Sequence, residues 1–478
     1  MKKTNQQIAQ KQENQPAAEF HSAADQAHPL NQRKIFQLGV FVLLLAGLIF
    51  SACSFNLDTI RTALKQITVT PETGVAQATP SLAAEEQSGT ETVEPPDISE
   101  ITNQHVLTIW LPPQFDPNDG TPAGDLLRQR LDAFMTEYPN VEIDVRIKAI
   151  SGPGGLLESL TTASAAAPDA MPTLILLNRA SLETAALKGL INPLDDISTT
   201  IDDTNWYEYA RELAIIQSSV YGLPFAGDAM ILVYRPSQFS TVPKDWDTIM
   251  GMQQQVLFPA ADPEGLLTLA EYRSLGAPIQ DTQLHPTLDA EQLSVVFNLY
   301  EDGARNGVFL NSSTQYQADS QVWQAYTEKS THAVITWSSH YLSELPADSS
   351  ATPLPVLGDE AYTIADGWMW ALSDTDPERK VLGVALAEYL VDSNFMAEWA
   401  PNTGYLPTRP TSLASINNQN LKTLLSQVVI SSHVRPSTDL TTAIGPAVQE
   451  AAVQIIKRQI NAMDAAQTAA DKLQTPAQ

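Results

Sequence analysis

The 478-residue sequence contains one cysteine, Cys53, so no disulfide bond can form within a single chain. Its seven histidines are scattered, and none stands near a cysteine or a second histidine at the spacing of a zinc site. We therefore expect no metal ion and no other cofactor.

Basic residues are also scarce. The chain has 27 lysines and arginines against 55 aspartates and glutamates, which gives a net charge of −28. A surface this acidic repels nucleic acid and anionic lipid headgroups, so we expect no nucleic-acid partner. The motifs Gly-x-Ser-x-Gly and His-Glu-x-x-His of common hydrolases are absent, and the loop Gly152–Gly155 lacks the Lys-Ser/Thr pair that a phosphate-binding loop requires.

Only one long apolar run is present, over residues 35–52. Arg33 and Lys34 precede it, and the small residues Ser51 and Ala52 end it. Basic residues, an apolar stretch and then small residues are typical of a secretory signal. The sequence therefore predicts export.

The cysteine that follows this run resembles the lipobox of a bacterial lipoprotein. The resemblance implies that Cys53 is lipidated and becomes the new N-terminus, although Phe50 stands where the family usually has leucine. The alternative is an uncleaved membrane anchor, since 18 residues lie within the range of about 17–25 for a spanning helix. Either way, basic residues before the run place the remaining chain outside the cytoplasm, tethered to the membrane.

The residues after the export segment 1–53 divide into a linker and a folded part. Residues 54–104 are rich in Thr, Pro and Glu and poor in large apolar side chains, so we expect a flexible linker. A coil of 51 residues spans roughly 40 Å. The rest exceeds what one core usually supports, so two domains are expected.

Hydrophobic periodicity predicts an α/β fold. Three apolar segments typical of strands, at 106–111, 141–147 and 173–177, alternate with amphipathic stretches typical of helices. This order indicates a parallel sheet flanked by helices, with ligands at the carboxyl ends of the strands. Beyond residue 200 we expect strands at 220–234, 332–337 and 362–372 among helices at 204–218, 266–275, 290–306, 320–328, 379–392, 394–399, 417–430 and 444–473.

Several segments resemble the extracellular solute-binding proteins of ABC importers, in the large sugar-binding group of family 1 type. They are Leu107-Thr-Ile-Trp110, residues 134–145, 187–195 and 221–234, Asp366-Gly-Trp-Met-Trp-Ala-Leu372, and residues 399–409. The resemblance implies a two-lobe periplasmic-binding-protein-like fold of type II, with the ligand in a cleft that closes about a hinge. We expect an N-terminal lobe at 105–225 plus about 330–372, and a more helical lobe at about 235–328 plus 374–478. Candidate hinge crossings are 224–234, about 329–336 and about 370–374.

Tryptophans at predicted strand ends are candidates for stacking on sugar rings, whose hydroxyl groups pair with carboxylates and other polar groups. The predicted ligand-binding residues are Trp110, Asp228, Trp337, Trp368, Tyr234, Asp366, Arg179 and Tyr405. For each tryptophan the alternative is core packing, which we expect for Trp206, Trp246, Trp323 and Trp399.

The resemblance implies a monomeric, non-catalytic protein that captures a carbohydrate and delivers it to ABC permease subunits. An acidic cleft with aromatic walls also suits a cationic solute such as a polyamine, and two or more carboxylates around the aromatic rings would favour that cargo. A secreted glycosidase with two catalytic carboxylates is a further alternative.

Overall fold

The computed structural model describes residues 101–358 and 361–474. The chain divides into two compact units, Met1–Ser88 and Gly89–Gln478, and all described residues belong to the second. The predicted export segment, Cys53 and nearly all of the linker lie outside the described residues. None of the helices in the described part is long and apolar enough to cross a membrane.

The first part of the chain forms the expected parallel β-α-β units. Strands β1 and β2 are parallel, as are β1 and β3, and the three lie in the order β2-β1-β3. Residues 174–177 of β3 are wholly buried, because helices cover both faces of the sheet there. The elements are β1 (His105–Leu111), α2 (Pro122–Glu137), β2 (Val141–Ile147), α3 (Leu156–Ala166), β3 (Leu174–Asn178) and α4 (Arg179–Leu187).

Two longer strands, β6 (Leu223–Tyr234) and β10 (Thr363–Leu372), continue the sheet. Strand β10 is antiparallel to β3 on one side and to β6 on the other, so the whole sheet is mixed. The far half of β6 pairs with β8 (Ala333–Trp337) and β9 (Ser350–Pro353). Strand β7 (Val256–Leu257) runs parallel to β8, and β11 (Ser432–Val434) runs parallel to β10.

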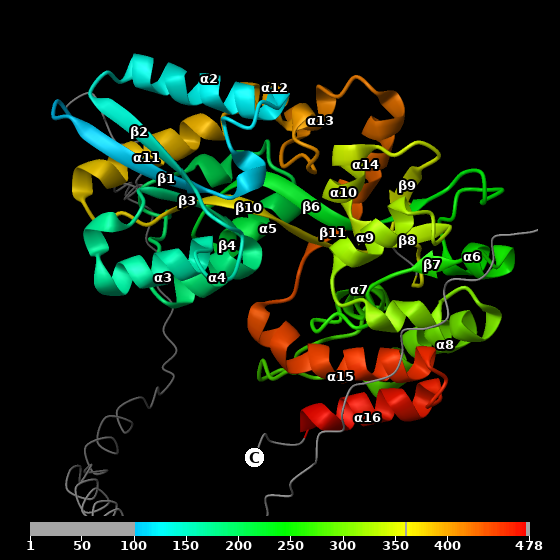
Figure 1. Cartoon of the computed structure of the whole chain (residues 1–478). Helices are drawn as coiled ribbons and strands as arrows, with labels where there is room; N and C mark the ends of the chain where they lie inside the picture. Colours follow the sequence, from blue (N-terminus) through cyan, green and yellow to red (C-terminus); the bar gives the residue numbers. More distant parts are fainter. Residues whose placement is uncertain (1–100, 359–360, 475–478) are drawn as a thin grey trace, which may run out of the picture. The chain divides into compact units, whose positions relative to one another are not determined.

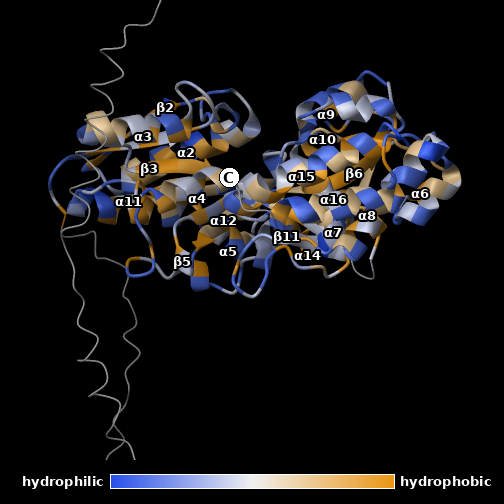
Figure 2. Cartoon of the chain, turned by 90° about the horizontal axis from the view of Figure 1, so that it is seen from below, coloured by the Kyte–Doolittle hydropathy of each residue, from blue (hydrophilic) through white to orange (hydrophobic). Residues whose placement is uncertain are grey.

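Helices cover the sheet around these long strands, as Figure 1 shows. In β6, Met230, Leu232 and Tyr234 join one core cluster, while Ile231 and Val233 join the other, as alternation along a strand requires. Figure 2 shows β3 and β6 as hydrophobic strands among helices with mixed faces. The helices are α5 (Glu208–Ala214), α6 (Trp246–Met252), α7 (Leu266–Ser274), α8 (Ala290–Asn306), α9 (Asp319–Thr327), α10 (Ser338–Glu344), α11 (Pro377–Leu390), α12 (Ser393–Trp399), α13 (Pro410–Ala414), α14 (Gln419–Ser431), α15 (Thr438–Ile456) and α16 (Ala462–Gln474).

Most predicted elements are confirmed to within a few residues, with three differences. The single helix expected at 444–473 is two helices, because Arg458 takes a left-handed φ of 58° and Asn461 then caps α16 by accepting a 2.9 Å bond from the backbone N–H of Asp464. The helix expected at 204–218 is only α5, and a short hairpin of β4 (Ile215–Ile216) and β5 (Ser219–Val220) follows it. Helices α6, α10 and α13 and the short strands β7, β9 and β11 were not predicted.

The buried apolar side chains form two core clusters, and the division between them differs from the predicted division into lobes. Helices α11, α12 and α14 contribute their buried side chains to the same cluster as β1 and β3. Helices α7, α8, α15 and α16 form the other cluster together with residues of β6 and β8. Residues 374–431, which were expected in the second lobe, have their buried apolar side chains in the same core cluster as the first strands. The lobe boundaries and the hinge crossings stay predictions.

Candidate functional site

A cavity of about 660 Å³ lies where the strands of the sheet end. Gln114 after β1, Ile150 after β2 and Asn178 at the end of β3 line one side of it. The loop after β7, the start of α7 and the first turns of α9 and α10 line another side, and residues of β6 and β10 lie between them. The sequence analysis expected the ligand site at the carboxyl ends of the strands, and the cavity lies there.

The structure brings five of the eight predicted site residues to this cavity and leaves three away from it. Asp228 and Asp366 are directly opposite each other in the pairing of β6 with β10, so the two carboxylates that the sequence could not connect are neighbours. The lining residues among the eight are Asp228, Trp337, Asp366, Trp368 and Tyr405; the others are Trp110, Tyr234 and Arg179.

The three remaining residues have structural partners instead. Trp110 is only 3% exposed in the first core cluster, and Lys148 Nζ lies 4.7 Å from its ring centroid. Tyr234 is buried in the second cluster with its ring against Phe239, at a centroid distance of 5.4 Å. The side chain of Arg179 donates to backbone carbonyl groups at the end of α5, including a 2.9 Å bond to Leu213. Trp206, Trp246, Trp323 and Trp399 are buried, as expected.

Asp228 sits in the middle of β6 and faces the N-terminus of α10. Its Oδ1 accepts hydrogen bonds from the Ser338 hydroxyl (2.7 Å), the Ser339 N–H (3.0 Å) and the Ala229 N–H (3.0 Å), and its Oδ2 accepts from the Ser339 hydroxyl (2.5 Å). Burial and, to a smaller extent, the charge of Asp319 raise the pKa of Asp228 to about 6, although the hydrogen bonds from Ser338 and Ser339 favour the charged form. Asp228 is therefore mainly ionised at neutral pH.

A second acidic group, Asp319, begins α9 and pairs with His340 of α10. The distance from His340 Nδ1 to Asp319 Oδ2 is 2.6 Å, and Asp319 Oδ1 accepts the backbone N–H of Trp337 at 3.2 Å. Burial lowers the pKa of His340, but its contact with Asp319 and the charges of Asp228 and Glu344 outweigh burial and raise it. The imidazole ring also stacks on Trp323.

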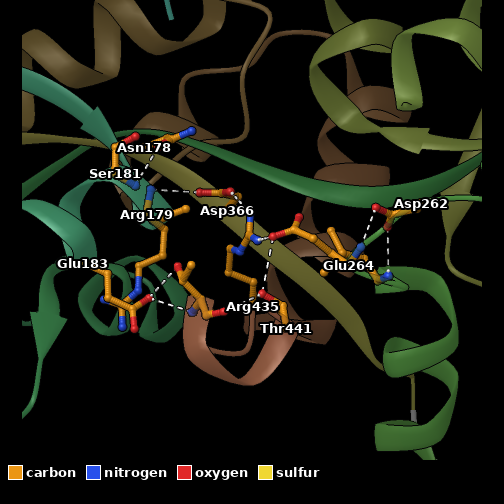
Figure 3. Close-up of polar contacts among 12 residues, drawn as sticks. Asn178, Arg179, Ser181, Glu183, Asp262, Glu264, Asp366, Arg435 and Thr441 are labelled. Atoms are coloured by element: carbon orange, nitrogen blue, oxygen red, sulfur yellow. Dashed lines mark hydrogen bonds and ion pairs between the residues drawn. The ribbon is translucent and has the colours of Figure 1, made fainter. Parts of the chain in front are cut away.

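A chain of charged groups crosses the cavity floor and is drawn in Figure 3. Asp366 Oδ1 accepts the backbone N–H of Arg179 at 3.1 Å, and its Oδ2 lies 3.0 Å from Nη1 of Arg435. The other amino group of Arg435 pairs with Glu264, in the loop that precedes α7. Burial opposes the charge on Arg435, but Asp366 and Glu264 outweigh it and raise its pKa.

Aromatic rings supply the apolar part of the site. Trp368 meets Phe115 edge to face at a centroid distance of 5.8 Å, and Tyr405 lies 5.1 Å from the same ring. Trp337, at the end of β8, is half-buried and contacts the second core cluster. Flat rings beside fixed carboxylates can cover an apolar face and pair polar edges at the same time.

Five charged or titratable residues of the site were not predicted: Asp262, Glu264, Asp319, His340 and Arg435. Their positions depend on long-range packing, and no local motif marks them. Across residues 101–358 and 361–474, no three His, Cys, Asp or Glu side chains are grouped to hold a metal ion.

The architecture is the two-lobe periplasmic-binding-protein fold, which several solved structures share. The sugar-binding protein MalE from Xanthomonas citri superposes with a TM-score of 0.64 at 16% identity, over 77% of this chain and 96% of that one. A cyclo/maltodextrin-binding protein in complex with maltotetraose gives 0.63 at 19% identity, over 78% and 98%. The maltose-bound MalE3 of T. maritima gives 0.61 at 17% identity, over 77% and 99%.

The sequence itself matches the family "Bacterial extracellular solute-binding protein" over residues 129–424. This match spans more than half of the chain, and the protein therefore belongs to that family. A search of curated protein sequences found no match.

Proposed function

We propose that this protein is the substrate-binding component of an ABC transporter and that it captures a carbohydrate in the cavity by hinge closure. The observation that carries the proposal is the lining of the cavity, in which Trp337, Trp368 and Tyr405 accompany Asp228 and Asp366. Aromatic faces suit the C–H surfaces of a sugar, and fixed carboxylates suit its hydroxyl groups. The maltose- and maltotetraose-bound relatives in fold support the same cargo class.

Hinge closure is supported by the course of the chain around the cavity. Strands β6 and β10 both line it, and each pairs with different strands at its two ends. Closure through a few strand residues needs changes in few backbone dihedral angles. Closing around a sugar would remove it from water and let the hydrogen bonds act in a low-dielectric site.

A cationic solute such as a polyamine is the second candidate cargo. Five carboxylates line the cavity, at residues 228, 262, 264, 319 and 366, and that number favours a positive ligand. However, Asp366 and Glu264 are already paired with Arg435, and Asp228 accepts from two serine hydroxyls. Carboxylates that are held in this way are directed acceptors for hydroxyl groups, which supports the sugar.

The proposed place of action is the outer face of the cell membrane. The family is extracellular, and Cys53 with the apolar run 35–52 provides a tether by lipidation or as an anchor helix. The residues up to 104 would keep the cavity within reach of a permease. Mass spectrometry of the mature N-terminus distinguishes a lipidated Cys53 from an intact anchor.

Isothermal titration calorimetry of the purified protein against maltodextrins, other neutral oligosaccharides and spermidine tests the proposal. The proposed function predicts saturable binding of a neutral oligosaccharide without hydrolysis, which chromatography of the recovered sugar checks. Binding of spermidine alone would favour the second candidate, and release of shorter sugars would indicate a glycosidase.

A further inference from the structure

Four helices begin at the cavity, α4, α7, α9 and α10, and at three of them a carboxylate of the protein already accepts an N–H of the first turn. Asp366 accepts the first N–H of α4, at Arg179, over 3.1 Å. Asp262 accepts the N–H of Leu266, the first residue of α7, over 3.0 Å. Asp228 accepts the N–H of Ser339 in the first turn of α10 over 3.0 Å.

The first turn of a helix is where proteins commonly bind phosphate, sulfate or carboxylate, because its N–H groups are unpaired and the dipole is positive there. Here the protein's own acidic side chains fill these positions. An anionic ligand would have to displace a carboxylate that is held by two or more hydrogen bonds, as Asp228, Asp262 and Asp366 are.

The cationic side chains that line the cavity are occupied as well. Arg435 pairs with Asp366 through one amino group and with Glu264 through the other (Figure 3). His340 pairs with Asp319. Among the described lining residues there is no other arginine, lysine or histidine. Neither cation is therefore available to neutralise a charge on a ligand.

The sum of charges points the same way. Five carboxylates face the cavity against two cationic groups, so the lining is net negative whether or not His340 is protonated. A negative charge on a ligand would be repelled by these carboxylates, and in a partly desolvated site water screens this repulsion only weakly. Uncharged hydroxyl groups meet no such barrier, since Asp228 Oδ2 accepts a single protein hydrogen bond and can accept another.

We propose that the cavity selects its cargo by charge: it binds uncharged and amino-bearing sugars and excludes sugars that carry a carboxylate or a phosphate. The residues that set this selection are Asp228, Asp262 and Asp366 at the helix starts, together with Glu264, which completes the pairing of Arg435. The inference rests on the proposed function for its cargo class and adds the charge of the cargo.

The test compares three forms of one oligosaccharide by titration calorimetry at pH 7.5. The probes are maltotriose, maltotriose with one 6-hydroxymethyl group oxidised to a carboxylate, and 6-amino-6-deoxy-maltotriose, with the same three forms of cellotriose and with spermidine. We expect the carboxylate form to bind roughly 100-fold more weakly than the neutral form, and the amino form to bind at least as well as the neutral one.

Equal binding of the neutral and carboxylate forms would overturn charge selection and leave the proposed function intact. Binding of spermidine without any sugar would overturn the proposed function and, with it, the charge selection among sugars. Failure of every probe to bind would count against both. The first outcome therefore separates the two hypotheses.

A variant tests the mechanism of exclusion within the same experiment. Asp366→Asn removes one negative charge and releases Nη1 of Arg435, so the ratio of neutral to carboxylate affinity should narrow about tenfold. The control Asp132→Asn makes the same change of charge on an exposed position of α2, outside the lining, and should leave the ratio unchanged. An unchanged ratio in Asp366→Asn, with the variant folded by circular dichroism, would contradict the mechanism.

Discussion

The hydroxyl of Ser339 donates a 2.5 Å hydrogen bond to Oδ2 of Asp228, and thereby joins the first turn of α10 to the middle of β6. The same carboxylate accepts the N–H of Ser339, so a residue pair 111 positions apart in sequence forms a two-point contact at the cavity. The two hydrogen bonds from Ser339 favour the charged form of this buried carboxylate, as hydration does for an exposed one.

Removing the serine hydroxyls should shift the protonation of Asp228. The pKa of Asp228 is raised by burial to about 6 and is held down from higher values by Ser339 and Ser338. In Ser338→Ala/Ser339→Ala the pKa should rise further, so that Asp228 is protonated nearer neutral pH. If its ionised form binds ligand, the loss of affinity on acidification should begin at higher pH than in the wild type.

Ligand affinity measured from pH 5 to 8 checks this shift. Ser415→Ala, at an exposed serine outside the cavity, serves as control. Identical pH profiles of the double variant and the wild type would show that Asp228 does not contribute to binding.

Trp337 and Trp110 should respond differently to truncation. Trp337 is half-buried and lines the cavity, so Trp337→Ala should weaken sugar binding at least about tenfold with a modest loss of stability. Trp110 is a core residue, and Trp110→Ala should cost about 3–5 kcal/mol of unfolding free energy. Denaturant unfolding and calorimetry on the same samples separate the two effects.

A half-buried aromatic residue outside the cavity, Tyr138, provides the control for Trp337. Tyr138→Ala should lose some stability and keep its affinity. Wild-type affinity in Trp337→Ala would remove this tryptophan from the site.

The difference between these tryptophans shows how far the sequence could lead. The apolar pattern placed β1, β8 and β10 correctly, and Trp110, Trp337 and Trp368 were chosen as aromatic residues at predicted strand ends or turns. That criterion does not say which way a side chain points, and the ring of Trp110 is packed into the core. The pairing of Asp228 with Asp366 depends on the register of β6 against β10, which no local pattern specifies.

The charged residues around Arg435 could not be predicted either, because their contacts join residues that are far apart in the sequence. Arg435 follows a three-residue strand that forms only because β10 offers a free edge, and its partner Glu264 is 171 positions away. Ordinary caps such as Asp289 before α8 follow the sequence rule. Helix α4 has such a local cap in Asn178, but the contact of Asp366 with the N–H of Arg179 spans 187 positions, and only the fold makes it.

Arg435 should be important for stability because removing it leaves two carboxylates without their partner. Its side chain is 8% exposed, that of Asp366 is 14% exposed and that of Glu264 is 35% exposed. We expect Arg435→Met to lower the free energy of unfolding by about 3 kcal/mol. Adding Asp366→Asn and Glu264→Gln to this variant should restore at least half of the loss, as urea unfolding can measure. If the triple variant is less stable than Arg435→Met, repulsion between the carboxylates is not the cause.

Glu271 should make the protein less stable as the pH rises. It is buried in the second core region on α7, where burial raises its pKa from 4.5 to about 8, and Trp246 acts in the opposite direction. Between these values the unfolded chain releases a proton that the folded protein retains, so stability is full below about pH 4.5 and falls until about pH 8. The total loss is on the order of 5 kcal/mol.

Glu271→Gln should therefore flatten the decline in unfolding free energy between pH 6 and 8, a range above the pKa of Asp228. Glu398→Gln, on an exposed position of α12, should leave the decline unchanged. A decline in Glu271→Gln as steep as in the wild type would mean that Glu271 is not the group that titrates.

The central claim is that the cavity binds a carbohydrate, and a thermal-shift screen of the purified protein tests it most directly. Sugars, amino acids and polyamines are compared at equal millimolar concentration. A ligand that binds only the folded state raises the unfolding temperature with the logarithm of its saturation, so a neutral oligosaccharide should raise the midpoint by several degrees. The account is contradicted if no sugar moves the midpoint while an amino acid or a polyamine does.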